Sequence, residues 1–136
     1  MNSSGFGSVE LQMLWLSILL GLVQVVLPVL FALGRTGWAI GPRDEAGPPS
    51  TRIGARLERA LANFLETFVF FAAAVLLLQV LGKHTANSAL GAQLYFWARL
   101  AYVPTYAAGI PFLRTLVWAV SLVGIVLVFL AAHPGM

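Results

Sequence analysis

Long apolar stretches alternate with short polar ones along the chain. A helix that crosses a bilayer needs about 20 predominantly apolar residues, and four stretches are close to that length. We expect these spans at residues 11–33, 60–81, 90–108 and 114–132. Together they use most of the 136 residues, so no large domain outside the membrane is predicted. The pattern predicts an all-α, integral membrane four-helix bundle that forms a single domain over residues 1–136.

The first apolar stretch contains no charged residue. A secretory signal peptide is the competing interpretation, but it needs a basic front end and a shorter apolar core. The only charged residue among the first ten is Glu10, so we favour a true span. The following segment, about residues 34–58, is rich in glycine, proline and charge, which predicts a loop.

The basic residues predict how the spans are oriented. The first loop contains Arg35, Arg43, Arg52 and Arg56. The third connection is bounded by Arg114, whereas the opposite side has only Lys83 besides the histidines. Because loops rich in Lys and Arg stay in the cytoplasm, loops one and three are expected there, with both termini on the outer side. His84 and His133 lie in a connection and the tail, where we expect them to be solvated.

Composition narrows the class further. Charged residues are only 10% of the chain, hydrophobic residues are 60%, and mean hydropathy is +0.88. These values exclude a disordered chain, a coiled coil and an ordinary water-soluble globule. The eight basic residues form no lysine-rich patch, so no nucleic-acid partner is expected. With no cysteine and two histidines, no metal site is expected, and any sulfur nucleophile must come from a ligand.

Polar residues interrupt the predicted spans at helical spacing. Arg59, Asn63 and Glu66 follow the spacing i, i+4 and i+7, which places them on one helix face. A charge inside a bilayer costs about 2.5–3.5 kcal/mol on insertion scales, so such residues are functional candidates by default. The competing interpretation is an Arg–Glu pair that only holds helices together.

A second polar face is predicted on the third span, where Arg99, Tyr102 and Tyr106 are spaced i, i+3 and i+7. Glu66 is the only acid within a span, so a structural Arg99–Glu66 pair is as well supported as a ligand role for Arg99. Tyrosines also form interfacial belts. Arg114 is either a topology signal or a permanent cation aimed at a bound anion.

The cytoplasmic ends of spans two to four thus combine guanidinium, carboxylate, amide and phenol groups. Guanidinium groups bind carboxylates in a fork, a carboxylate binds an amine, and phenols donate and accept hydrogen bonds. This set suits a small zwitterionic or anionic ligand.

The sequence RALANFLE, from Arg59 to Glu66, resembles the R-x3-N-x2-E signature of the MAPEG superfamily, the membrane-associated proteins in eicosanoid and glutathione metabolism. The first loop with Gly41 to Asp44, the Tyr102–Tyr106 pair and Arg114 extend the resemblance over nearly the whole chain. It implies a homotrimer of four-helix subunits that binds glutathione between subunits, near the cytosolic side.

The resemblance also implies a role for each site residue. Arg114 would face the glutathione sulfur, with Thr115 and Asp44 as further catalytic candidates carried over from the prostaglandin E synthase branch. The implied glutathione-binding residues are Arg35, Arg59, Asn63, Glu66, Arg99, Tyr102 and Tyr106. Eicosanoid branches have a proline where this chain has Val69, and the leukotriene synthase branch has a tyrosine at Thr67. The chain therefore looks more like the short bacterial members, which implies the bacterial inner membrane.

The function implied is a glutathione transferase of the microsomal type, with possible peroxidase activity toward lipid hydroperoxides. Apolar electrophiles would reach it from the bilayer. One alternative is a non-catalytic bundle of the same family that binds other membrane proteins. A small four-helix transporter is less favoured, because such transporters use an acid within span one and this span has only Gln12 and Gln24.

Overall fold

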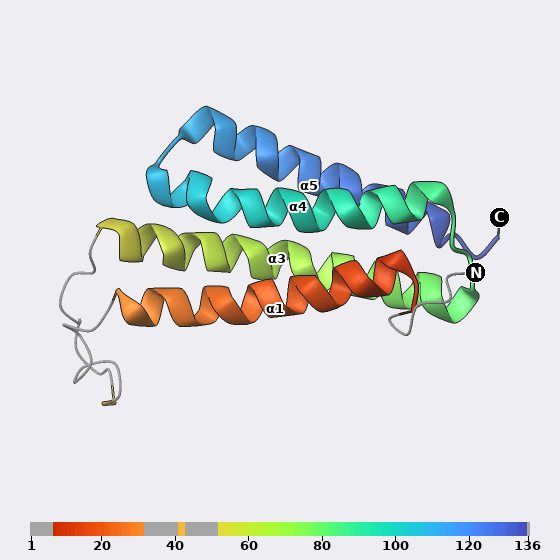
Figure 1. The fold of residues 1–136 in the computed structure, drawn as a ribbon, viewed down its shortest axis with the longest axis horizontal. Helices are drawn as coiled ribbons and strands as arrows, with labels where there is room; N and C mark the ends of the chain where they lie inside the picture. The colour runs from red at the N-terminus through yellow and green to blue at the C-terminus, as the bar shows by residue number, and fades with distance from the viewer. Residues whose placement is uncertain (1–6, 32–40, 43–51, 136) are drawn as a thin grey trace.

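Four helices make up the part of the chain that the computed structural model describes, which comprises residues 7–31, 41–42 and 52–135. They are α1 (Val9–Leu30), α3 (Arg52–Leu81), α4 (Ala86–Ala108) and α5 (Pro111–Ala131). Each helix runs antiparallel to its neighbour in the chain (Figure 1). The end of α1, the start of α3 and the α4–α5 turn lie at one end of the bundle. The α3–α4 connection lies at the other end, as do the start of α1 and the end of α5.

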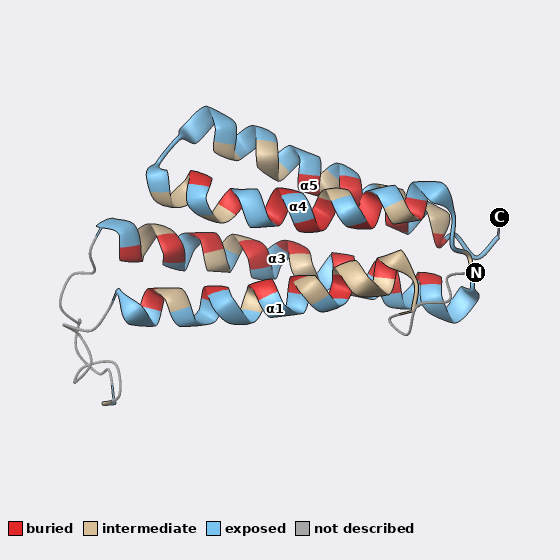
Figure 2. Cartoon of the chain, viewed as in Figure 1, coloured by how far each residue is buried: buried red, intermediate tan, exposed pale blue. Residues whose placement is uncertain are grey.

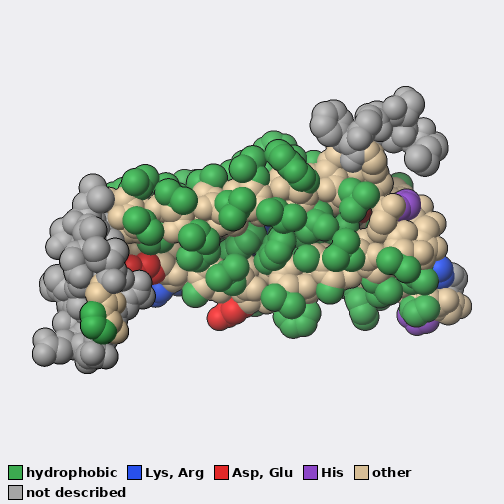
Figure 3. Space-filling view, turned by 90° about the horizontal axis from the view of Figure 1, so that it is seen from below, with side chains coloured by type: hydrophobic (Ala, Val, Ile, Leu, Met, Phe, Trp, Pro, Cys, Tyr) green, Lys and Arg blue, Asp and Glu red, His purple; other side chains and the backbone are tan. Residues whose placement is uncertain are grey.

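The outer surface of the bundle is apolar. In Figure 3, hydrophobic side chains cover most of the described part of the face that is shown. Side chains such as Val80 and Phe112 are more than four-fifths exposed, while the buried positions lie where the helices face one another (Figure 2). By length and composition, α1, α3 and α5 are apolar enough to cross a membrane. The chain is therefore an integral membrane protein with an all-α bundle fold, as predicted.

Helix α4 is not among these membrane-capable helices, and several of its polar side chains lie on its inner face. Ser88, Arg99, Tyr102 and Thr105 are all buried there. Its 23 residues run the length of the bundle beside α5 (Figure 1). The expected span at residues 90–108 thus corresponds to a helix of the bundle whose buried polar side chains point inward, and its crossing of the membrane stays a prediction.

Capping residues explain where the helices begin and end. Ser88 and Thr85 form a reciprocal capping box, so α4 begins at Ala86 rather than near residue 90. Pro111 occupies the first turn of α5, where a missing N–H does no harm. The largest difference from expectation is in the first loop. Residues 52–58 were expected in that loop but form the first two turns of α3.

Glycines let α4 and α5 approach closely. A Cβ added at Gly124 would lie 2.5 Å from the carbonyl oxygen of Gly91, and one added at Gly91 would lie 2.6 Å from that of Gly124. Small residues allow this backbone contact between membrane helices. Beside it, the Tyr95 ring stacks on Phe71 with centroids 4.0 Å apart, and the Tyr95 hydroxyl hydrogen-bonds Thr67 at 3.1 Å. The close approach of Gly91 and Gly124 sets how α4 and α5 pack against each other.

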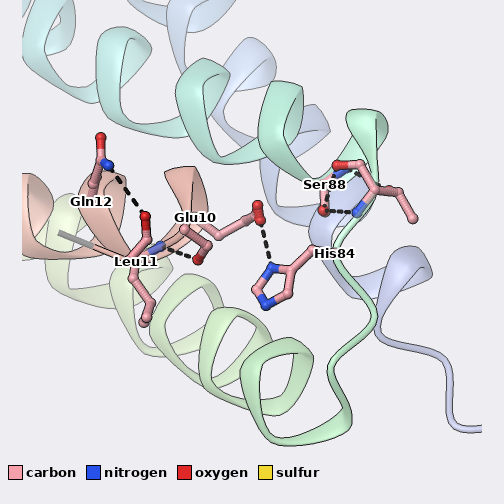
Figure 4. A network of polar contacts seen from close by, with 8 residues as sticks. Glu10, Leu11, Gln12, His84 and Ser88 are labelled. Atoms are coloured by element: carbon pink, nitrogen blue, oxygen red, sulfur yellow. Dashed lines mark hydrogen bonds and ion pairs between the residues drawn. The ribbon is translucent and has the colours of Figure 1, made fainter. Parts of the chain in front are cut away.

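The end of the bundle away from the α4–α5 turn is held by polar contacts. The carboxylate of Glu10, at the start of α1, lies 2.9 Å from Nδ1 of His84 in the α3–α4 connection (Figure 4). Lys83 donates from Nζ to the backbone oxygen of His133 at 2.7 Å. His84 is exposed, as expected, but it is also the partner that the buried carboxylate of Glu10 needs, because Glu10 is only 2% exposed.

Candidate functional site

Three of the predicted site residues meet at the end of the bundle that contains the α4–α5 turn. Nε of Arg59 on α3 donates a hydrogen bond to the hydroxyl of Tyr106 on α4 at 3.2 Å. The Cζ atom of Arg114 on α5 lies 4.9 Å from the Tyr106 ring centroid, and that of Arg59 lies 5.9 Å from it. Three helices thus place two permanent cations on one phenol ring.

The tight α4–α5 turn brings Arg114 back to Tyr106, eight residues earlier in the chain. Gly109 ends α4 in the left-handed conformation, with φ of 75°, which glycine adopts without strain. Pro111 then starts α5. The Arg114 N–H donates to the carbonyl of Ile110 at 3.1 Å, so Arg114 sits within the first turn of α5. The positive end of the helix dipole adds to its charge there.

The guanidinium of Arg99 lies deeper in the bundle. Arg99 is 1% exposed, and its Cζ atom lies 4.1 Å from the Tyr102 ring centroid and 5.8 Å from that of Phe64. The rings stabilise the cation through their negative faces. Its three guanidinium nitrogens have no hydrogen-bond partner within the described residues. The alternative of a structural Arg99–Glu66 pair is therefore wrong, because the guanidinium rests on aromatic faces instead.

Within the described residues, the side chains of Asn63 and Glu66, which complete the α3 signature, form no hydrogen bond or ion pair with another helix. Glu66 is exposed, and in the described part of the chain no ion pair joins it to Arg59, which binds Tyr106 instead. The interpretation of these residues as an Arg–Glu pair between helices is not supported. Oδ1 of Asn63 is buried and lacks a partner among the described residues.

Two buried polar groups without a hydrogen-bond partner among the described residues therefore lie on neighbouring helices near Arg59, Tyr106 and Arg114. One is the amide oxygen of Asn63, and the other is the guanidinium of Arg99. Buried polar groups are nearly always hydrogen-bonded in native proteins, so both groups favour a polar ligand or partner. A ligand that offers carboxylates to the guanidinium groups and amide groups to the asparagine fits this donor and acceptor set.

Other predicted residues are not brought into the cluster. Thr115 is exposed, and its hydroxyl donates to the backbone oxygen of Pro111 at 3.2 Å. Arg35 and Asp44 lie outside the described residues. The structure adds Arg56, one turn before Arg59 on α3, which donates to the backbone of α4. The sequence does place Arg56 on the same helix face as Arg59, three residues earlier. It could not show which backbone carbonyl Arg56 binds.

Fold and site together define a small helical membrane protein with a polar, cationic site at one end of an otherwise apolar bundle. The model of the MAPEG family matches residues 13–133, which is nearly the whole chain. The chain therefore belongs to the MAPEG family. Membership places it broadly among the membrane-associated proteins in eicosanoid and glutathione metabolism. No curated protein matches the chain.

Proposed function

We propose that this protein is a membrane-bound glutathione transferase that also reduces lipid hydroperoxides. The observation that carries the proposal is the convergence of Arg59 and Arg114 on the Tyr106 ring. The cluster lies at the end of an apolar bundle, where a water-soluble thiol and a bilayer-soluble electrophile can meet. Family membership supports the same conclusion.

Arg114 is assigned to the glutathione sulfur. A free thiol is mostly protonated at neutral pH, and only the thiolate is the nucleophile. A nearby cation lowers the pKa of a thiol because it favours the charged form, and each unit corresponds to about 1.4 kcal/mol. Arg114 combines a guanidinium that cannot lose its proton with the first turn of α5. Thr115 and Asp44 are kept as secondary candidates for hydrogen bonding in the chemical step.

The other residues are assigned to the peptide part of glutathione. Arg59, Asn63 and Glu66 present one cation, one amide and one carboxylate on a single face of α3, which matches the charges and amides of a tripeptide. Arg99 and Tyr102 line the deeper side of the proposed site. Tyr106 connects them to Arg59, because its ring lies 5.5 Å from that of Tyr102 and its hydroxyl accepts a hydrogen bond from Arg59. Arg35, from the first loop, is proposed to reach a glutathione carboxylate.

Exposed Glu66 supports the further proposal of a homotrimer. In a single chain its carboxylate stands on the outer face of α3, within a helix apolar enough to cross a membrane. Exposure of a charge to lipid is unfavourable by about 2.5–3.5 kcal/mol. A second copy packed against α3, with glutathione between the copies, removes that exposure.

The reactions follow from the thiolate. In conjugation, the sulfur forms a bond to an electrophilic carbon, the leaving group takes the bonding electrons, and the thiol proton goes to solvent. In peroxide reduction, two glutathione molecules become one disulfide while the hydroperoxide becomes an alcohol and water. The sided charge distribution supports a cytoplasmic site with both termini outside. The bacterial inner membrane is proposed as the location because the chain resembles the short bacterial members of the family.

The test is product formation by the protein purified in detergent. Glutathione is supplied with an aryl halide in one assay and with a fatty-acid hydroperoxide in another, and products are identified by mass spectrometry. We expect a glutathione conjugate or disulfide with the wild type and a large loss for Arg114→Ala. Arg52→Ala removes an exposed arginine from the start of α3 and serves as the matched control. If glutathione neither binds nor reacts, the non-catalytic bundle that binds other membrane proteins is the better assignment.

A further inference from the structure

We propose that Arg56 is a positioning residue that sets the place of Tyr106 and Arg114, and that it does not itself bind glutathione. This inference rests on the proposed function. Its basis is a contact between helices: Nη1 of Arg56 on α3 donates to the backbone oxygen of Ala107 on α4 at 3.1 Å. The residues are 51 positions apart in sequence, so the bond ties two helices together at the site.

The carbonyl that Arg56 binds is one that α4 cannot satisfy itself. The last four carbonyl groups of a helix have no partner within the helix. At the end of α4, the carbonyl of Thr105 accepts from the N–H of Ile110 at 3.3 Å, and that of Tyr106 accepts from the N–H of Gly109 at 3.0 Å. Arg56 supplies the partner for the next carbonyl, so a residue of α3 completes the C-terminal cap of α4.

Gly109 is shaped to receive the guanidinium. A Cβ built at this position would lie 2.7 Å from Cζ and Nη1 of Arg56 and 2.8 Å from Nη2. A Cβ at this position would displace the guanidinium, which is the movable end of a flexible side chain, and the residue would adopt a φ of 75° that L side chains avoid. Arg56 and Gly109 form one packed unit at the turn between Tyr106 and Arg114.

Two arginines one turn apart on α3 thus hold the same short stretch of α4. Arg59 binds the side chain of Tyr106, while Arg56 binds the backbone of the next residue. The α4–α5 turn follows directly and leads into the first turn of α5, where Arg114 sits. A shift of the turn would move the Arg114 guanidinium relative to the Tyr106 ring. Displacements of about 1 Å are enough to reduce rates about 100-fold.

The test separates positioning from binding. Arg56→Met keeps an unbranched apolar stem but removes the donor, and Arg56→Lys keeps the charge but not the planar fork. In both variants we expect kcat for the aryl halide to fall about 10- to 100-fold and the thiolate absorbance of bound glutathione to fall with it. The Kd for glutathione should stay within about threefold, because Arg56 itself makes no contact with glutathione and the binding residues Arg59, Asn63 and Glu66 remain on α3. Arg52→Met is the matched control.

A substitution on the other side of the contact makes the test independent of Arg56. Gly109→Ala should reproduce the same split, with kcat lowered and the Kd for glutathione nearly unchanged. A rise in Kd of about tenfold or more for Arg56→Met, with kcat preserved, would show that Arg56 is a ligand and overturn the proposal. Full activity of Arg56→Met would overturn it as well.

The wild type separates this inference from the proposed function. If the wild type shows a thiolate signal and Arg56→Met retains it fully, only the positioning role fails. If the wild type gives no signal and no product, the proposed function fails, and the positioning role fails with it. Circular dichroism of each variant checks that the bundle is folded, and Arg56→Lys supplies the result if Arg56→Met does not fold.

Discussion

Gly124→Ala should destabilise the bundle through the contact between α4 and α5. The added Cβ would lie 2.5 Å from the carbonyl oxygen of Gly91, 2.7 Å from the backbone nitrogen of Tyr95 and 3.2 Å from its Cα. All three neighbours are backbone atoms, so no side-chain rotation relieves the collision. To move from 2.5 Å to the 3.4 Å of ordinary contact, α4 and α5 must separate by about 0.9 Å.

The magnitude follows from two opposing effects. Overpacking of a close contact typically costs about 1–3 kcal/mol, and the rigid backbone on both sides places this site near the upper end. Replacing glycine by alanine within a helix stabilises the helix by about 0.8–1 kcal/mol, because alanine has the higher helix propensity. The net expectation is a loss of about 2 kcal/mol in the free energy of unfolding.

Gly21→Ala is the matched control, because it is the same substitution within a membrane helix. There the added Cβ meets only the ring of Phe64, at 2.9 Å from Cε1 and 3.4 Å from Cζ. The Phe64 ring must move by about 0.5 Å to restore ordinary contact, which costs less than separating two backbones, so with the propensity gain the net change should stay within about 1 kcal/mol.

The assay is unfolding of both variants in mixed micelles with increasing denaturing detergent, followed by circular dichroism. A Gly124→Ala protein as stable as the wild type would refute the close contact of α4 with α5. Equal losses for Gly124→Ala and Gly21→Ala would show that the difference between backbone and side-chain neighbours does not matter.

Three further outcomes are expected at other positions. Arg114→Ala should reduce turnover about 10- to 25-fold at neutral pH, because lowering a thiol pKa of about 8.5 by one to two units raises the thiolate fraction by about that factor, with a smaller change in the Kd for glutathione; equal losses in turnover and binding would count against its role. Arg59→Ala and Glu66→Gln should each weaken glutathione binding about tenfold by calorimetry, or about 1.4 kcal/mol, and unchanged affinity would remove them from the site. A double-mutant cycle of Glu10→Gln and His84→Ala should give a coupling energy above about 0.5 kcal/mol in unfolding experiments, whereas additive losses would mean that the pair does not hold α1 to the α3–α4 connection.

The architecture could be predicted from the sequence because lipid imposes a simple rule. A stretch of about 20 apolar residues must form a helix, so α1 and α5 are evident from composition. The start of α3 was harder to predict. Residues 52–58 are polar enough to read as loop, yet they form helix, where Arg56 gains a partner on α4. A contact 51 residues away in sequence leaves no local signal.

The candidate site could be predicted in part for a related reason. Helical spacing places Tyr102 and Tyr106 on one face, and the structure brings their rings to 5.5 Å. Spacing along a chain cannot show which partner a charge chooses across helices. Glu66 was the obvious acid for Arg99, but the guanidinium instead lies 4.1 Å from the Tyr102 ring centroid. Local periodicity thus identifies polar faces, whereas packing between helices decides their partners.

The most direct test of the central claim is the ultraviolet difference spectrum of the wild-type protein titrated with glutathione at neutral pH, with proton release recorded in parallel. Thiolate activation by Arg114 predicts a saturable thiolate band, one proton released per bound glutathione that forms thiolate, and loss of both signals with S-methylglutathione or with Arg114→Ala. Saturable glutathione binding with neither a thiolate band nor proton release would refute this activation, because the cluster around Tyr106 would then bind the tripeptide without activating its sulfur.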